Sequence, residues 1–389
     1  MKFNKWTVAL AAAGLVSFGH NTQAEEAGNA VMTALSKTTL SGYVDTSVSW
    51  SDTSAAVPLW GRVAYQNTAK MDGFNLDVIG LTLEQPLDES DWAAGYHVDL
   101  LIGPDASWYS GISPIATAGA ANDTIGIKQA YVATRAPIGN GLDLKLGVYD
   151  AIIGYEVFTN GANPNYSRSM AYNLEPFSHT GALASYQVNE MIGLSAGIAN
   201  TSRSVLNDRP GTLGASSSHF SYMAAIAIVA PESAGVLSGA TLYAGFLDGL
   251  AGNTSTQPDT VNYYVGAALP TPVEGLALGL AYDRVEDAPA GVAGIDADVI
   301  GAYASYQATD KLAVHGRIEY LSGDAGVLGY GGVDDEELLG LTATLDYSLW
   351  DNVITRLEGR WDQQLDDNPD AYGSGDDVFT LTLNAIYNF

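Results

Sequence analysis

The stretch from Val378 to the last residue, Phe389, constrains the fold most, because its residues alternate in polarity. The apolar parity holds Phe379, Leu381, Leu383, Ala385, Tyr387 and Phe389, and the other parity holds Thr380, Thr382, Asn384 and Asn388. A period of two indicates an extended strand with one apolar and one polar face. The strand ends on an aromatic residue, where a soluble domain usually carries a loose polar tail. The final strand of a soluble sandwich remains the alternative, but the aromatic end favours the closing strand of an outer-membrane barrel.

The other end of the chain predicts a secretory signal peptide. A short basic segment precedes a largely apolar run from Trp6 to Phe18, and a small-residue motif ends at Ala24. This run is too short and wrongly flanked for a membrane-spanning helix. The chain then divides into residues 1–24 as a cleaved signal peptide, residues 25–37 as a short periplasmic segment, and residues 38–389 as the barrel.

Composition narrows the class of protein. The chain has no cysteine, which excludes disulfides and thiol chemistry. Charged residues make up only 15% of the chain, below the roughly 25% of soluble domains. The 44 acidic residues far outnumber the 16 basic ones, so we expect no nucleic-acid partner. The 43 glycines and 22 tyrosines fit twisted strands with aromatic girdles.

Alternation recurs along the chain and predicts about sixteen strands. The predicted ranges are 38–51, 60–84, 93–103, 124–135, 142–153, 178–187, 190–200, 219–229, 238–247, 259–269, 275–284, 295–306, 310–321, 335–348, 352–363 and 377–389. Every second connection tends to be short, as at Val188-Asn189, and the others are long, as between Gly103 and Asp123. Short turns at one end and long loops at the other are typical of a transmembrane barrel. The second predicted strand, residues 60–84, is unusually long, and the facing of the strands within 219–247 is undecided because both parities are apolar.

The sequence shows no catalytic or transition-metal arrangement. Its five histidines are scattered and no Gly-x-Ser-x-Gly motif occurs, so we expect no enzyme. Asp366, Asn368 and Asp370 have a spacing that could bind calcium, but Ala371 stands where such a loop needs glycine. A solvated acidic loop is the stronger interpretation, and Ca²⁺ or Mg²⁺ at the acidic loops is the one weak cofactor candidate.

The segment after the fifth predicted strand, residues 154–180, is long and rich in asparagine and aromatic residues. In sixteen-stranded porins the loop at this position folds into the lumen and narrows it. The predicted constriction residues are Glu156, Asn163, Asn165, Tyr166 and Arg168. The predicted pore-wall residues, on the polar parity of their strands, are Lys145, Arg317, Glu319, Arg356, Glu358 and Arg360. Opposite charges across a constriction would set a transverse field, whereas the alternative role of these ion pairs is structural bracing.

Several blocks resemble the second beta-barrel porin family, often labelled OmpL-like. They are Phe74–Leu87, Gly95–Ala106, Gly139–Gly147, Gly154–Val157, Asn163–Ser169 and Pro176–Gly181. The resemblance covers roughly residues 38–187, and the C-terminal half agrees only in pattern. It implies an outer-membrane barrel with a channel role, while the solute does not carry over.

The sequence therefore predicts an all-β fold, a closed antiparallel transmembrane barrel in the outer membrane of a Gram-negative bacterium. The expected function is passive diffusion of small hydrophilic solutes through a water-filled lumen narrowed by the loop after strand five. A non-conducting surface or adhesion barrel is the alternative, and a barrel lipase is disfavoured by the missing motif. The expected partners are outer-membrane lipid, small solutes and the assembly machinery that reads the strand ending at Phe389, with a homotrimer as a candidate assembly.

Overall fold

The described residues form sixteen strands that close into an antiparallel barrel, as the alternation predicts. The structure is a computed structural model that describes residues 38–52, 72–109, 124–202, 206–208, 220–250, 259–290, 293–323, 336–366 and 376–389. The strands are β1 (Thr39–Ser51), β2 (Gly73–Gln85), β3 (Ala94–Ile102), β4 (Ile125–Ala136), β5 (Leu142–Asp150), β6 (Ser178–Gln187), β7 (Ile192–Ala199), β8 (Ser221–Val229), β9 (Thr241–Leu250), β10 (Asp259–Pro270), β11 (Leu276–Ala290), β12 (Ala293–Gln307), β13 (Leu312–Gly323), β14 (Glu336–Trp350), β15 (Val353–Gln364) and β16 (Asp377–Asn388). The short helices are η1 (Pro104–Trp108), η2 (Asn160–Ala162), α2 (Met170–Leu174) and η3 (Glu232–Leu237).

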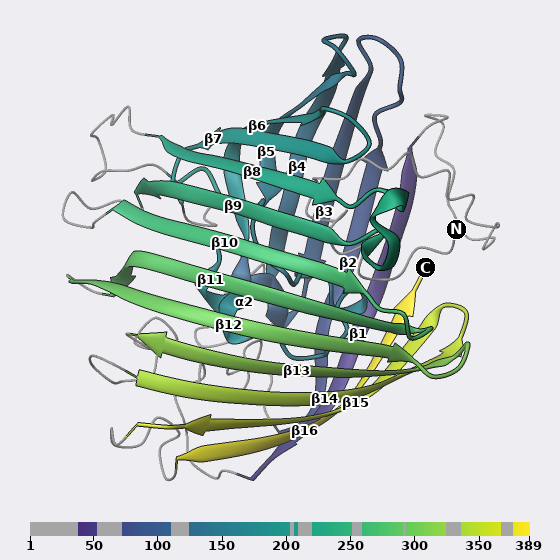
Figure 1. Ribbon diagram of the computed structural model, residues 1–389, viewed down its shortest axis with the longest axis vertical. Coiled ribbons are helices and arrows are strands. Elements are labelled where there is room, and N and C mark those ends of the chain that lie inside the picture. The colour runs from purple at the N-terminus through teal and green to yellow at the C-terminus, as the bar shows by residue number, and fades with distance from the viewer. Residues whose placement is uncertain are drawn as a thin grey trace.

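Neighbours in sequence pair around the whole barrel, and β1 closes it by pairing with β16. In that seam Val48 lies opposite Leu383. Closure pairs both sides of every strand, which satisfies backbone hydrogen bonds where lipid offers none. The start of β1 and the end of β16 lie at the same end of the barrel (Figure 1). We call it the turn end, because most connections there are short, and the opposite end the loop end.

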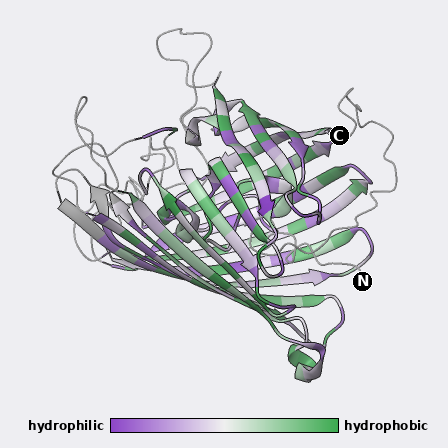
Figure 2. Ribbon diagram, turned by 90° about the horizontal axis from the view of Figure 1, so that it is seen from above, coloured by the Kyte–Doolittle hydropathy of each residue, from purple (hydrophilic) through white to green (hydrophobic). Residues whose placement is uncertain are grey.

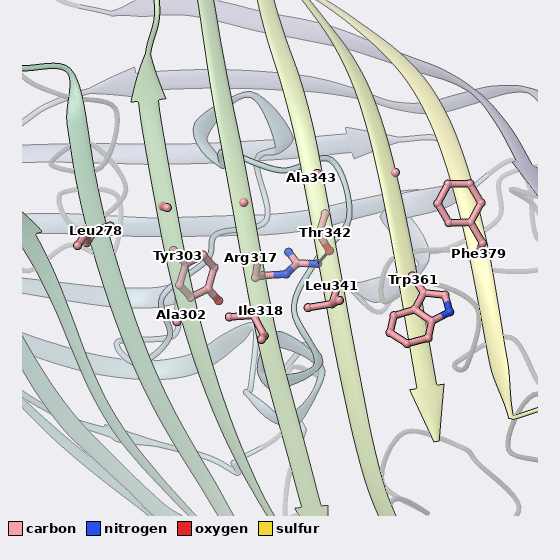
Figure 3. A pocket seen from close by; sticks show the side chains of 13 residues that line it. Leu278, Ala302, Tyr303, Arg317, Ile318, Leu341, Thr342, Ala343, Trp361 and Phe379 are labelled. Carbon is pink, nitrogen blue, oxygen red and sulfur yellow. Dashed lines mark hydrogen bonds between the residues drawn. The ribbon is translucent and has the colours of Figure 1, made fainter. Parts of the chain in front are cut away.

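Side chains alternate between the two faces of the wall, and strand hydropathy alternates with them (Figure 2). The outer face carries exposed apolar side chains, among them Ile318, Leu341, Leu345, Leu357, Leu381 and Leu383. On this face a groove of about 500 Å³ is lined by larger side chains such as Ile318, Leu341 and Trp361 and by small ones such as Ala302 and Ala343. Figure 3 shows these side chains. The structure also gives the facing of β8 and β9, which the sequence left undecided. Met223, Ala225 and Tyr243 are buried in the interior, whereas Tyr222 and Phe246 are exposed on the outer face.

The predicted strand ranges agree with the observed ones to within three residues, apart from the second and the eleventh. The predicted eleventh strand, residues 275–284, ends six residues before the end of β11, which continues to Ala290. As described, β2 begins at Gly73, and the earlier part of the predicted strand, residues 60–71, lies outside the described residues. The predicted signal peptide and the segment 25–37 also lie outside them. None of the helices in the described ranges has the length and apolar character needed to cross a membrane.

The connection between β5 and β6, residues 151–177, contains η2 and α2 and folds inside the barrel. We call it the inner loop. In Figure 1, α2 lies within the barrel, behind the strands β10–β12. Contacts of the inner loop divide the interior into three sectors: a charged sector at β13–β16 and β1, an apolar sector centred on β8–β12, and a polar sector at β2–β5. Within the polar sector, a smaller apolar cluster packs Phe158 of the inner loop against Val78 and Leu101.

Candidate functional site

In the charged sector, Arg317 of β13 binds the inner loop most extensively. Its Nη1 donates to Oε1 of Glu156 at 2.9 Å and to the carbonyl of Ser167 at 2.8 Å. Its Nε lies 3.1 Å from Oε1 of Glu319 on the same strand. A guanidinium presents several donors in a rigid fork. Arg317 can therefore hold the loop backbone and two carboxylates at once.

Two arginines of β15 act in the same way. Arg356 donates to the carbonyl of Asn160 at 3.0 Å and to that of Asn163 at 2.8 Å, while Arg360 donates to the carbonyl of Arg168 at 2.5 Å. Each is also paired with an acid of the wall, Arg356 with Asp346 and Arg360 with Asp362. The positive charges are thus neutralised by the wall while their remaining donors hold loop carbonyls.

Carboxylates of the wall accept the N–H groups of the loop. Glu358 accepts from the backbone of Tyr166 at 2.6 Å and of Ser167 at 2.9 Å. Glu319 accepts from the backbone of Met170 at 2.5 Å. Hydrogen bonds to charged groups contribute about 1.5–3 kcal/mol each. Wall donors and acceptors together therefore fix the backbone of the loop tip, residues 158–167, and of the residues that follow it.

The tip also reaches across to other strands and back onto itself. Asn165 donates to Thr344 of β14 at 2.8 Å, and Asn160 donates to Asp45 of β1 at 2.9 Å. Arg168 folds back inside the loop and donates to the carbonyls of Val157 and Phe158 at 3.0 and 2.7 Å. The loop thus has an internal frame that is independent of the wall.

The apolar sector packs against the two ends of the inner loop. Ile152 and Ile153 pack with residues of β8–β10, and Tyr155 stacks on Tyr303 with ring centroids 4.2 Å apart. Gly279 permits this approach, because a Cβ there would lie 1.7 Å from the Tyr155 hydroxyl. A second cluster joins α2 to the wall through Met170, Ala171, Leu174, Val285, Ala297, Val299, Leu321, Leu338 and Val378. Burying a large apolar side chain contributes about 1.5–3 kcal/mol.

The polar sector differs from the other two in its access to water. Side chains of the ion-paired groups in the charged sector are only 0–3% exposed, as for Arg317, whereas in the polar sector His97, Asp99 and Asp150 are 17%, 13% and 24% exposed. Glu84, nearer the turn end, reaches 38%. Within the described ion pairs of the interior, water therefore reaches β2–β5 and not β13–β15.

Charges in the polar sector form a connected array. The ring nitrogens of His97 lie 3.1 Å from Glu84 and 2.9 Å from Asp99. Lys128 lies 3.6 Å from Asp99 and also binds Asp150. These groups run from near the turn end of β2 to the loop end of β5, so they follow much of the height of the wall.

A small cavity lies at the root of the inner loop. Its volume is about 30 Å³, enough for on the order of two waters. Its polar lining includes Asp150, Glu156 and Glu175. Burial, together with the nearby carboxylate of Asp283, raises the pKa of Glu175 well above its usual range. Glu175 and Asp283 therefore favour sharing a proton over carrying two charges.

All five predicted constriction residues lie in the inner loop and are buried: Glu156, Asn163, Asn165, Tyr166 and Arg168. Five of the six predicted wall residues meet this loop or its partners: Arg317, Glu319, Arg356, Glu358 and Arg360. The sixth, Lys145, lies apart from them on β5. In the calcium candidate, Asp366 accepts hydrogen bonds from the backbone of Glu337 and from Gln364. Asn368 and Asp370 lie outside the described residues, and no cluster of potential metal ligands occurs among the described ones.

Apart from Lys145, sequence reasoning missed the charges of the polar sector. His97 and Asp99 alternate with Val98 and Leu100, so the period-two pattern already separates them from the outer face. The lysine at 128 is harder to find, because the pairing of β3 and β4 shifts register between Asp99 and Leu100. A shift of one residue reverses the facing that alternation predicts.

A model of a known family matches nearly the whole chain. The model of the family described as "Putative beta-barrel porin-2, OmpL-like" matches residues 37–389, which spans all sixteen strands. The match therefore also covers the C-terminal half, beyond the sequence blocks between Phe74 and Gly181 that carry the resemblance. A comparison with curated proteins finds no match.

Solved structures with a similar fold include outer-membrane channels and porins. The channel DcaP of Acinetobacter baumannii has a TM-score of 0.59 at 12% identity, covering 90% of this chain and 97% of its own. An anion-selective porin from Comamonas acidovorans has a TM-score of 0.60 at 12% identity, covering 90% and 99%. OprB of Pseudomonas putida has a TM-score of 0.58 at 12% identity, covering 90% and 93%. At this identity the likeness establishes the fold.

Proposed function

Because the chain belongs to the OmpL-like beta-barrel porin family, we propose that it conducts small hydrophilic solutes passively across the outer membrane of a Gram-negative bacterium. The turn end faces the periplasm and the loop end faces the exterior, as the short turns and long loops favour. The single observation that carries the proposal is the inner loop, whose tip is bound to the wall by Arg317, Arg356 and Glu358. A loop held in this way narrows the lumen to a fixed size.

The water path runs along the polar sector, between the inner loop and β2–β5. Partial exposure of Glu84, His97, Asp99 and Asp150 supports this course. The arginines of β13 and β15 brace the loop, and the mixed charges of β2–β5 face the solute. Carboxylates beside Lys128 and His97 order water across a narrow path, which disfavours apolar solutes.

The path is weakly selective for cations. Acidic residues outnumber basic ones by 44 to 16 in the chain, and clefts lined by one sign of charge concentrate counter-ions. The preference is small, because the polar sector also contains Lys128 and Lys145. It increases at low ionic strength, where screening is weak.

A non-conducting surface barrel is the second candidate, and one observation favours it. The inner loop fills the charged and apolar sectors, where side chains such as Arg317 and Val299 are almost fully buried. Its Phe158 also packs against Val78 and Leu101 in the polar sector. If the polar sector were also closed by the loops, the barrel would serve as a platform for its long external loops. Catalysis is not part of either candidate.

Liposome swelling separates the two candidates. The purified barrel is reconstituted into liposomes, which are then placed in isotonic solutions of sugars of increasing size. A porin lets the smallest sugars enter and excludes larger ones, whereas a plugged barrel admits none. Single-channel recording in planar bilayers supplies the unit conductance, and its absence at every voltage would exclude the porin assignment.

Partners follow from the same proposal. The outer face contacts lipid, and the final strand, ending at Phe389, is read by the assembly machinery. The barrel assembles as a homotrimer; a structure of OmpT of Vibrio cholerae is described in a trimer form. Ca²⁺ or Mg²⁺ at the acidic loops, including Asp366, remains the one cofactor candidate, and calorimetric titration of either ion tests it.

A further inference from the structure

Lys145 on β5 is a lumen-facing cation that the structure leaves without an anionic partner. Its backbone lies opposite Ala133 on β4 and opposite Leu183 on β6. Neither neighbour offers a hydrogen-bond acceptor in its side chain. Among the described residues, the ammonium makes no hydrogen bond or ion pair. Its Nζ lies over the ring of Tyr131, 4.7 Å from the ring centroid.

The carboxylates nearest to Lys145 are bound to other cations. Asp143 forms a two-pronged pair with Arg135, at 2.6 and 2.7 Å. Asp150 binds Lys128. Both carboxylates attract Lys145 only over a longer range. An ammonium has three donors and loses free energy when they are unsatisfied, so water or a passing solute must fill these positions.

An aromatic array holds this ammonium in place. His97 stacks on Tyr131 with ring centroids 5.4 Å apart and an angle of 9° between the rings. Lys145 lies over the same Tyr131 ring, and such a contact contributes about 0.5–1 kcal/mol at a hydrated site. These contacts restrict the conformations of the Lys145 side chain and hold its ammonium at the edge of the water path.

We propose that Lys145 is a binding point for the carboxylate of small anionic solutes during their passage through the lumen. This inference rests on the proposed function and names a solute class for it. An ammonium and a carboxylate form a charge-assisted hydrogen bond, and Lys145 is the cation of the polar sector whose charge is not already bound to a carboxylate. It gives a locally anion-binding position within a path whose other cations are paired with carboxylates.

The site predicts weak, saturable binding. A single point charge beside water binds a carboxylate less tightly than a bidentate arginine does. Weak binding suits a channel, because a solute must enter the site and also leave it. Binding should weaken as salt rises, because screening reduces the attraction.

Benzoate is a suitable probe of this site. Its binding to the detergent-solubilised, folded barrel is measured by calorimetry at low salt, and its block of single-channel current is measured in parallel. The Lys145→Gln variant should weaken binding by on the order of tenfold, the consequence of losing one hydrogen bond to a charged group. Lys145→Arg keeps the charge and should retain most of the affinity.

Lys311→Gln is the matched control, because Lys311 lies in the exposed turn between β12 and β13 and donates to the carbonyl of Leu349. It removes the same charge outside the lumen and should leave benzoate binding unchanged. Equal benzoate affinity in wild type and Lys145→Gln, or an equal loss in Lys311→Gln, overturns the inference even if the barrel conducts. Binding that depends on Lys145 in a barrel that does not conduct supports the site and rejects the proposed function instead.

Discussion

Replacing Arg317 by methionine should release the inner loop without unfolding the barrel. Arg317 is the residue that joins β13 to Glu156, Ser167 and Arg168 of the loop. Methionine keeps an unbranched apolar stem and removes all of these donors. The strand itself should remain paired, because β13 is held to β12 and β14 by backbone hydrogen bonds.

The expected magnitude follows from what the substitution leaves behind. Glu156 loses a guanidinium at 2.9 Å, while Glu319 keeps a second one, from Arg360, at 3.3 Å. Two loop carbonyls, of Ser167 and Arg168, also lose a donor. Removing one partner of a buried ion pair costs about 3–5 kcal/mol. The free energy that docks the loop should fall by that amount, which makes opening more frequent by roughly 150- to 4,000-fold.

Hydrogen exchange of residues 151–177, followed by mass spectrometry, measures this opening directly. In Arg317→Met the loop amides should exchange much faster, while strand amides keep their protection. Arg284→Met is the control, because Arg284 pairs with Glu286 and Asp298 near the loop end and is partly exposed. Its loop protection should match that of the wild type. Unchanged loop exchange in Arg317→Met would refute the bracing role assigned to this arginine.

Three further predictions address facing, pH and loop position. Leu341→Arg places a charge on the outer face and should cost roughly 2–4 kcal/mol in unfolding experiments in lipid, and a cost below 1 kcal/mol would mean that the facing is wrong. Docking raises the pKa of Glu175 through burial and the carboxylate of Asp283. Docking is therefore strongest below the pKa that Glu175 has in the released loop, about 4.3, and it weakens as pH rises above that value. Loop exchange corrected for intrinsic rates should therefore be faster at pH 8 than at pH 5, and Glu175→Gln should remove most of this difference. Because the chain has no cysteine, cysteines placed at Asn165 and Thr344, whose side chains lie 2.8 Å apart, should crosslink with a short reagent, and failure to do so argues against an inward loop.

Much of the fold could be predicted from the sequence, because the outer face of a barrel must be apolar at every second residue. This rule located fourteen of the sixteen strands to within three residues, the second and the eleventh being the exceptions. It left residues 219–247 undecided for a physical reason. In β8 and β9 the inner face is also apolar, because Met223, Ala225 and Tyr243 pack against Ile152 and Ile153 of the inner loop. The ambiguous pattern was therefore itself a sign that this lumen wall is packed.

The partners of the site residues could not be predicted. Arg317 and Arg356 bind carbonyls that lie 150 and 193–196 residues away in sequence. Carbonyl groups are present in every residue, so no side-chain pattern marks them as partners. The sequence indicated charged positions on the inner face, and only the three-dimensional arrangement separates the arginines that brace the loop from Lys145, which faces the polar sector.

The conductance of a loop-shortened barrel tests the central claim most directly. Replacing residues 158–167 by a short glycine linker removes the tip that Arg356 and Glu358 hold and leaves all sixteen strands intact. The account predicts that this variant forms channels of clearly higher unit conductance and weaker ion selectivity than the wild type in planar bilayers. A folded variant whose conductance and selectivity equal those of the wild type would contradict it, because the inner loop would then not limit permeation.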